Sequence, residues 1–138
     1  MSAKWAHSLI RISKHEVETL QKRVGEITER RMVCERRIQA MHEEASREAE
    51  IFRRDAEAGW YQAGYVQGFR AMRDRLLLQI EEIKVEEEGA RDALSRAFEE
   101  LKKFEHVAEV SRLADAKEQA RRETAAMDEM GLRKSTGR

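Results

Sequence analysis

The 138-residue chain carries 27 basic and 27 acidic side chains, so its formal net charge is zero. A nucleic-acid-binding protein draws affinity from a basic surface that releases counterions from phosphates, and this chain has no basic excess. Charged residues make up 39% of the sequence, aromatic residues only 6%, and proline is absent. This composition is typical of long helices or coiled coil and argues against a compact globule with a thick core.

The cysteine count and the hydropathy pattern indicate the cellular compartment of the protein. Cys34 is the single cysteine, which excludes an internal disulfide framework and suits a reducing compartment. The N-terminal segment lacks the apolar region of a signal peptide, and no run of about 18 apolar residues occurs. We therefore expect a cytoplasmic protein that does not insert into a membrane itself.

Apolar residues recur at heptad spacing through the first half of the chain, which predicts a helix over about residues 5–57. Alternating spacings of three and four residues mark the seam of a supercoiled helix. One row is Ile10, Val17, Val24, Ile38, Ala45 and Phe52, and the other is Leu20, Ile27, Cys34 and Met41.

The second half shows the same pattern, which predicts a second helix over about 65–131 and a flexible tail over 132–138. Tyr65 and Met72 lie on a slightly rotated face, so the spacing through Leu76 indicates a four-residue stutter. One row is Phe69, Leu76, Ile83, Ala90, Ala97 and Phe104, and the other is Ile80, Leu94, Leu101 and Ala108.

These two rows predict an all-α fold, a long two-helix antiparallel coiled-coil hairpin that forms one domain over residues 1–138. The bend is expected at about 58–64, and the register that best matches the rows pairs Phe52 with Phe69 and Ile38 with Ile83. The second helix is the longer one, so its C-terminal end should overhang. The overhanging segment 121–134 carries apolar residues at near-helical spacing, as a docking helix would.

Polar residues interrupt the seam at Arg31, Glu48 and Glu87. In the expected register Glu48 faces Arg73, and Arg31 lies within one layer of Glu87. A polar pair in a seam costs stability but fixes register and orientation. The alternative is that these side chains extend along their stems into water.

The bend segment "DAEAGWYQAGYVQGF" (55–69) combines glycines with half of the aromatic residues of the chain. Gly59 and Gly64 can take the positive φ that a turn requires. Trp60, Tyr61 and Tyr65 cannot all be buried by two helices, and an exposed aromatic cluster marks a partner surface. Plain packing of the loop is the alternative.

We find no pattern that points to an enzyme, a cofactor or a metal. A two-helix hairpin offers ridges and no enclosed cleft for convergent catalytic groups. The glycines lack the strand and the lysine of a phosphate-binding loop. The four histidines are scattered, and a metal site in a bundle takes ligands from four helices. Cys34 is expected to fill the seam as a small apolar residue.

The chain resembles the FliJ family, the small coiled-coil component of the flagellar type III export apparatus. Its size and hairpin pattern match over essentially the whole chain. The run "GYVQGF" (64–69) is similar to the family's aromatic–glutamine run at the start of its second helix. The segment "KKFEHVAE…RRETAAMDEM" (102–130) resembles the basic C-terminal helix that closes on Arg-Glu and Asp-Glu pairs.

The resemblance implies a stalk-like protein that sits in the hexameric FliI-like export ATPase, promotes its ring form and couples it to the FlhA-like export gate. A FliH-like regulator and export chaperones are further implied partners. The implied location is cytoplasmic and peripheral, at the flagellar base on the inner membrane. Flagellum biogenesis, motility and a chaperone-like role follow from the same resemblance.

The resemblance also implies two contact surfaces. The ATPase ring would contact the end that holds both termini, through Trp5, Leu9, Ile10, Arg121, Arg122, Glu123, Asp128, Glu129 and Met130. The export gate would contact the aromatic end, through Trp60, Tyr61, Tyr65, Phe69, Met72 and Leu76. On the first helix this sequence has Met41, Glu44 and Glu48 where some relatives have aromatic residues.

Two other functions fit the residues. An escort protein for export substrates or their chaperones would use the aromatic bend and not the tail. A generic scaffold would use the same heptads between two chains.

Overall fold

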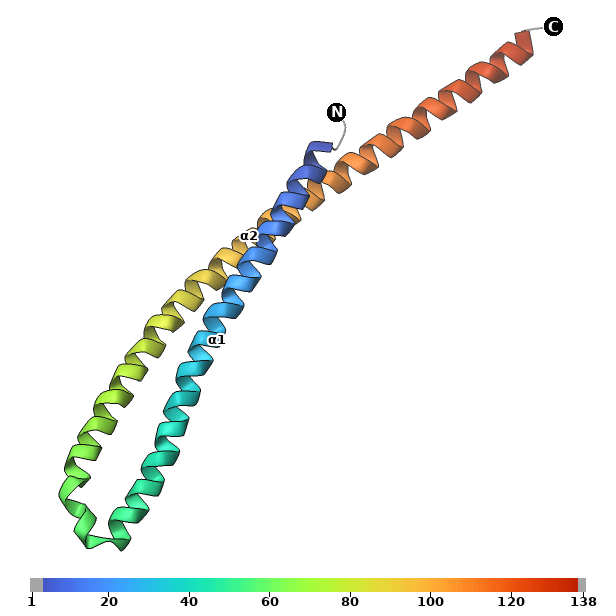
Figure 1. Cartoon of the computed structure of the whole chain (residues 1–138). Helices are drawn as coiled ribbons and strands as arrows, with labels where there is room; N and C mark the ends of the chain where they lie inside the picture. The colour runs from blue at the N-terminus through green and yellow to red at the C-terminus, as the bar shows by residue number, and fades with distance from the viewer. Residues whose placement is uncertain (1–3, 137–138) are drawn as a thin grey trace. The chain divides into compact units, whose positions relative to one another are not determined.

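The computed structural model describes residues 4–136, and these form an all-α antiparallel hairpin (Figure 1). Helix α1 spans Lys4–Arg54, the short 3₁₀ helix η1 spans Ala56–Tyr61, and helix α2 spans Gln62–Thr136. The two α-helices have 51 and 75 residues. The expected fold class, a two-helix hairpin with a longer second helix, is confirmed.

The element boundaries differ from those expected. Helix α1 ends at Arg54, η1 occupies the bend, and α2 begins at Gln62. Helix α2 continues to Thr136, so the expected end of the second helix at about 131 is wrong, and the flexibility of the tail stays a prediction. Arg133 bonds back to Glu129 one turn earlier, at 3.2 Å, which supports this last part of the helix. Residues 137–138 lie outside the described part of the chain.

One residue interrupts the helical backbone at the bend. Asp55 has φ −119° and ψ 98°, and its carboxylate accepts a hydrogen bond from the Glu57 N–H at 3.0 Å. This is the geometry of a helix N-cap, a position that aspartate favours. The expected positive φ at Gly59 and Gly64 is wrong, because no glycine within residues 4–136 has one. The chain turns through a single extended residue and a 3₁₀ turn instead.

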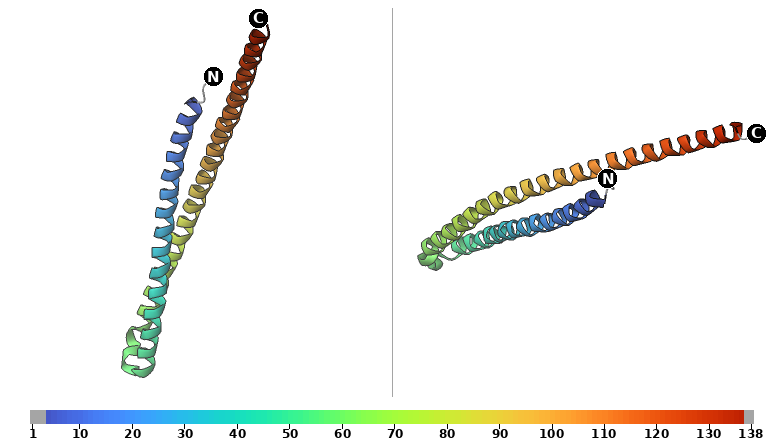
Figure 2. Two further views of the ribbon diagram at one scale, coloured as in Figure 1. Left: turned by 90° about the vertical axis from the view of Figure 1, so that its right-hand side faces the viewer. Right: turned by 90° about the horizontal axis from the view of Figure 1, so that it is seen from above.

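The helices contribute to two compact units, which we call the bend unit (Thr19–Leu94) and the terminal unit (Met1–Glu18 with Ser95–Arg138). In the bend unit α1 and α2 run alongside each other in Figure 1 and in the right-hand view of Figure 2. Its core cluster is made of the predicted seam residues. The buried members are Ile27, Cys34, Ile80, Ile83 and Ala90, and Val24 and Ile38 pack against them.

The terminal unit has a thinner core made of smaller side chains. Ala6, Ser13 and Val17 of α1 and Ala97 and Leu101 of α2 are buried. Helix α2 then continues past the start of α1, and every described side chain from 119 to 135 is exposed (Figure 1). We call residues 119–136 the overhang.

The ring partner of Phe52 on α2 differs from the expected one by about one helical turn. Phe52 meets Tyr65, with ring centroids 6.0 Å apart, and does not form the expected ring pair with Phe69. Phe69 instead meets the ring of His42 at 5.4 Å. The expected bend was centred too late in the chain, because the extended backbone of Asp55 already ends α1.

The predicted stutter at Met72 is also wrong. Met72 is 44% exposed, whereas Arg73 lies half-buried on the seam between Phe69 and Leu76. The Arg73 guanidinium lies 6.0 Å from the Phe69 ring centroid and donates to Asp74 at 3.1 Å, so no expected pair with Glu48 is formed. The seam keeps its regular spacing because a long arginine stem can cover apolar surface.

We predict that Ile27→Ala lowers the free energy of unfolding by about 2–5 kcal/mol, because it removes a buried side chain and leaves a cavity. Ile27 is 3% exposed in the core cluster. Ile12 of the same helix is 64% exposed, so Ile12→Ala should change stability by about 0.5 kcal/mol or less. Urea unfolding followed by circular dichroism measures both. An equal loss of unfolding free energy in the two variants would contradict the burial of Ile27 in the seam.

Candidate functional site

A polar layer lies inside the seam of the bend unit. Arg31 Nε donates to Glu87 Oε2 at 2.9 Å, and Arg31 Nη1 donates to Glu35 at 2.9 Å. Glu87 also accepts from Arg91 at 3.4 Å. The Arg31 and Glu87 side chains are only 22% and 12% exposed, so both polar groups are held in a partly dry environment. The structure brings the two predicted register residues together, and their role in fixing register stays a prediction.

The hydrogen bond from Arg31 lowers the pKa of the Glu87 carboxyl, although burial opposes this shift. The same hydrogen bond, with a second to Glu35, raises the pKa of Arg31. Both shifts favour the charged forms. Directly before this pair on each helix, Glu86 accepts two hydrogen bonds from Arg30 at 3.1 Å, so a second cross-helix pair adjoins the first.

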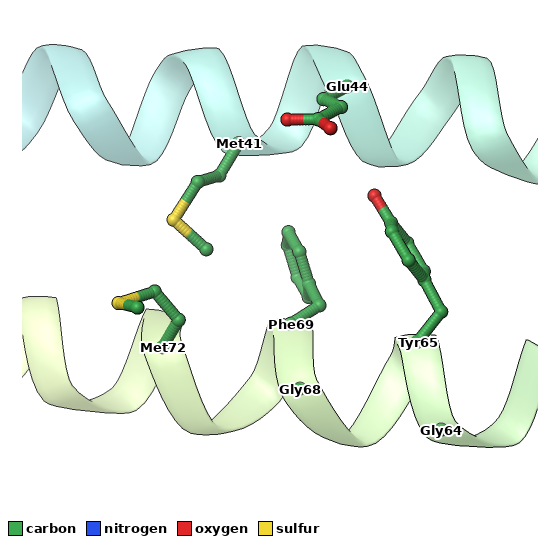
Figure 3. A pocket seen from close by; sticks show the side chains of 7 residues that line it. All are labelled: Met41, Glu44, Gly64, Tyr65, Gly68, Phe69 and Met72. Carbon is green, nitrogen blue, oxygen red and sulfur yellow. The ribbon is translucent and has the colours of Figure 1, made fainter.

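A groove of about 280 Å³ opens between the helices near the bend. In Figure 3 the Tyr65 and Phe69 side chains of α2 point toward α1, and the Met41 side chain of α1 points toward Met72. Glu44 supplies the single carboxylate of the lining. The residues that line the groove are Met41, Glu44, Gly64, Tyr65, Gly68, Phe69 and Met72.

The groove combines adaptable apolar walls with one polar end. Methionine side chains are flexible and polarisable, so they can repack around an inserted group. Burial raises the pKa of the Tyr65 hydroxyl, and the negative charges of Glu44 and Glu48 raise it further. The groove therefore suits an apolar side chain whose neighbour carries a hydrogen-bond donor or a positive charge for Glu44.

The aromatic residues of the bend form a chain of edge-on contacts. Phe52 meets Tyr61 at 5.1 Å between ring centroids, and Tyr61 meets Trp60 at 5.2 Å. Trp60 itself is 84% exposed. Tyr61 and Tyr65 thus cap the end of the seam, while Trp60 remains a surface group.

The predicted gate-contact residues divide into two groups. Trp60, Tyr61, Tyr65, Phe69 and Met72 all lie in the bend unit with some surface open to solvent. Leu76 does not belong to this surface, because it is 2% exposed in the seam. From sequence alone, a heptad position this close to the bend can be assigned either to the surface or to the core. The packing of the two helices places Leu76 in the core.

The predicted ring-contact residues all lie in the terminal unit. Trp5 is 49% exposed, and Leu9 and Ile10 are half-buried. On α2 the predicted charged residues Arg121, Arg122, Glu123, Asp128 and Glu129 are exposed, as is Met130.

Ion pairs within one helix organise the charged surface of the overhang. Arg121 and Arg122 donate to Glu118, at 2.8 and 3.4 Å, and Gln119 donates to Glu123 at 3.4 Å. Such pairs support a helix that has few tertiary contacts.

A second groove, of about 490 Å³, lies in the terminal unit between Ile10 and Ala108. Its rim is charged, and Arg112 there lowers the pKa of the Glu109 carboxyl by a hydrogen bond at 2.7 Å. The remaining lining residues are His7, Lys14, Glu105 and Asp115.

Sequence reasoning missed several residues that build these surfaces. Ala6 and Ser13 are buried in the seam, and His42 packs on Phe69. Ser13 and Ala6 lie seven and fourteen residues before Leu20, in the same heptad row. The heptad spacing could have found both, had small and polar residues been counted.

The part of the chain that the structure describes offers neither a metal site nor a membrane span. Within residues 4–136 no group of histidine, cysteine or acidic side chains could hold a metal ion. None of the described helices is long and apolar enough to cross a membrane.

Comparison with known proteins decides the family. The chain is 54% identical over 132 residues to the "Flagellar FliJ protein" of Caulobacter vibrioides, strain NA1000 / CB15N, and equally to that of strain ATCC 19089 / CIP 103742 / CB 15. The alignment covers 96% of this chain and 95% of each relative. The chain belongs to the FliJ family. No family model and no solved structure matches it.

We predict that the polar layer makes the stability of this FliJ-family hairpin depend on acid pH. Because the pKa of Glu87 is lower in the folded chain, its contribution is present above the ordinary value of about 4.3. It is lost as the pH falls through the lowered folded value. Urea midpoints between about pH 3 and 6 should therefore fall on acidification.

Glu87→Gln should flatten part of that fall, because the amide does not titrate. Glu43→Gln provides the matched control, since Glu43 is exposed and bonds only its own helix, from Gln39 at 3.4 Å. The same pH dependence in wild type and Glu87→Gln would show that the polar layer does not carry the effect.

Proposed function

We propose that this FliJ-family chain is a flagellar export component that acts as a stalk in the hexameric export ATPase. The terminal unit would enter the ring and promote its assembly, and the bend unit would reach the export gate. The protein would work in the cytoplasm at the flagellar base. In this proposal it makes and breaks no covalent bond.

The overhang is the observation that carries the proposal. Every described side chain in it is exposed, including Met127 at 72%, Met130 at 60% and Leu132 at 66%. A helix without tertiary contacts is only marginally stable in water, so exposed apolar residues on it favour a partner. Trp5 adds a large exposed side chain to the same unit.

The coupling mechanism follows from asymmetry. A hairpin has no sixfold symmetry, so its contacts with the subunits of a hexameric ring must differ. A ligand that binds one subunit conformation better than another shifts the balance between them. Binding in the ring and nucleotide binding are then linked by a coupling free energy that acts in both directions. The charged overhang would make these contacts sensitive to salt.

The groove near the bend supports the gate contact. Met41, Phe69 and Met72 offer an apolar lining, and Glu44 supplies a carboxylate. An anchor side chain from the gate protein could fill this groove, and Tyr65 could pack against it. Anchors of this kind dominate the energy of many interfaces.

A second candidate, an escort for export chaperones or substrates, is favoured by Trp60. Its side chain is 84% exposed at the bend. An escort would bind its partners at the bend and would not need the overhang. A FliH-like regulator could bind either the bend unit or the terminal unit.

We predict that the full chain stimulates ATP hydrolysis and ring formation by the cognate export ATPase, and that truncation after Ala120 abolishes both effects. The truncation removes exposed helix and leaves the core residues of both units in place. Steady-state hydrolysis and ring particles counted by electron microscopy provide the measurements.

Trp60→Ala is the control for this experiment, because it alters the bend and should leave stimulation unchanged. If the folded full chain neither binds nor stimulates the ATPase, the proposed stalk function is contradicted. Binding of export chaperones that Trp60→Ala abolishes would then favour the escort.

We further predict that Met72→Glu weakens binding of the gate protein's cytoplasmic domain about tenfold or more, because it places a charge in the apolar groove beside Glu44. Leu78→Glu is the matched control, since Leu78 is exposed on α2 and does not line the groove. Titration calorimetry compares the two variants. Equal affinity of both would place the gate contact elsewhere.

A further inference from the structure

The seam positions on the two sides of the bend share one heptad phase. On α1 these half-buried positions are Ala45, Glu48 and Phe52, and on α2 they are Val66, Phe69 and Arg73. Glu50 and Tyr65 are half-buried as well but lie outside this phase. Phe52 and Val66 lie two whole heptads apart, so the alternation of three and four residues resumes after the bend without a shift. A hairpin does not require this, because its bend can begin the second helix at any phase.

The backbone of the bend is nearly helical already. Gln62 has α-helical φ and ψ, η1 is right-handed, and no residue in the described part of the bend has a positive φ. Asp55 alone is extended, and the Asp55 N–H still bonds the Ile51 carbonyl at 2.9 Å, as in a helix. Rotation of this one residue, with relaxation of η1, would join α1 and α2 into one helix.

We propose that the bend is a hinge, and that a second copy of this chain can exchange helices with the first. In the exchanged dimer the joined helices run antiparallel, and α1 of one copy packs on α2 of the other. The seam contacts of the bend unit away from the bend itself would be kept, including the Arg31–Glu87 pair. Domain swapping costs little where the same contacts form between copies.

The observed pairing also places the centre of such a dimer. Phe52 of one copy would face Tyr65 of the other, as it does within the hairpin. Continuing that register inward brings Gly59 close to Gly59 of the second copy at the two-fold axis. Glycine at the crossing allows a close approach of the two backbones but adds no side-chain packing.

Two interactions hold the hairpin form and would be lost on exchange. The Asp55 carboxylate caps η1 through the Glu57 N–H, and a continuous helix has no free N–H there. The Phe52–Tyr61 ring contact at 5.1 Å requires the chain to turn back on itself within the bend. These two interactions therefore set the balance between the monomer and the exchanged dimer.

A disulfide reporter distinguishes the two forms in the full chain. Cys34 and Ile83 belong to one core cluster and line one groove of about 250 Å³, so an Ile83→Cys variant should cross-link to Cys34. The link closes within one chain in the hairpin and joins two chains in the exchanged dimer. Non-reducing gels and light scattering distinguish the linked monomer from the linked dimer. Circular dichroism checks that the helix content is unchanged.

Refolding at high protein concentration should give interchain links in the reporter chain. Asp55→Ala should raise the dimer fraction about tenfold at equal concentration, because alanine removes the cap and favours helix. Insertion of Gly-Ser-Gly after Gly59 should lower that fraction, because it breaks the heptad phase and lengthens the turn.

Two results would overturn the hinge. One is a folded Asp55→Ala chain that forms only intrachain links at every concentration. The other is a dimer that links equally well through Cys34 with Ile83 retained, because an antiparallel exchange keeps the two Cys34 side chains apart.

Discussion

Burial of one apolar stripe from each helix is the interaction on which every other feature depends. Neither helix has a core of its own, and a long isolated helix is marginal in water. The stripe residues of the bend unit, with Ile27, Ile80 and Ile83 at its centre, supply the apolar contacts that hold α1 against α2. Where the stripe of α2 loses its partner, the helix continues as an exposed overhang.

The polar layer sets limits on how the stripes can pair. Apolar stripes tolerate a slip of one heptad, but a slip would separate Arg31 from Glu87 and leave both side chains in a partly dry seam. A parallel in-register pairing of two chains would place Arg31 against Arg31. The same pair that costs desolvation therefore favours antiparallel pairing, both within one chain and in the exchanged dimer that we propose.

Much of the fold could be predicted from heptad spacing, because burial in a two-helix seam follows directly from position in the repeat. Ile27, Cys34 and Ile83 lie where their spacing put them. The bend could not be predicted in the same way. Its geometry depends on one extended residue, Asp55, and the glycines that looked decisive keep ordinary right-handed conformations. The expected centre of the bend and the expected pairing register near it depend on each other, so the error in the bend is also an error in that register.

The candidate surfaces could be predicted in part, where a residue's position in the sequence pattern is enough to indicate its exposure. Exposed residues such as Trp60 and Met130 stand out against a charged sequence, whereas the groove depends on the register that places Met41 and Glu44 near Phe69. Leu76 shows the limit, since its place in the repeat and its place near the aromatic run suggested two different roles. Packing assigned it to the seam.

Hydrogen exchange by mass spectrometry, with and without the export ATPase, tests the central claim most directly. The account predicts that amides around Ile27 and Ile83 exchange slowly in both samples, while the overhang exchanges fast alone and becomes protected in the complex. An overhang that is already protected in the free protein would contradict the account. Protection that the ATPase confers only on the bend would contradict it equally.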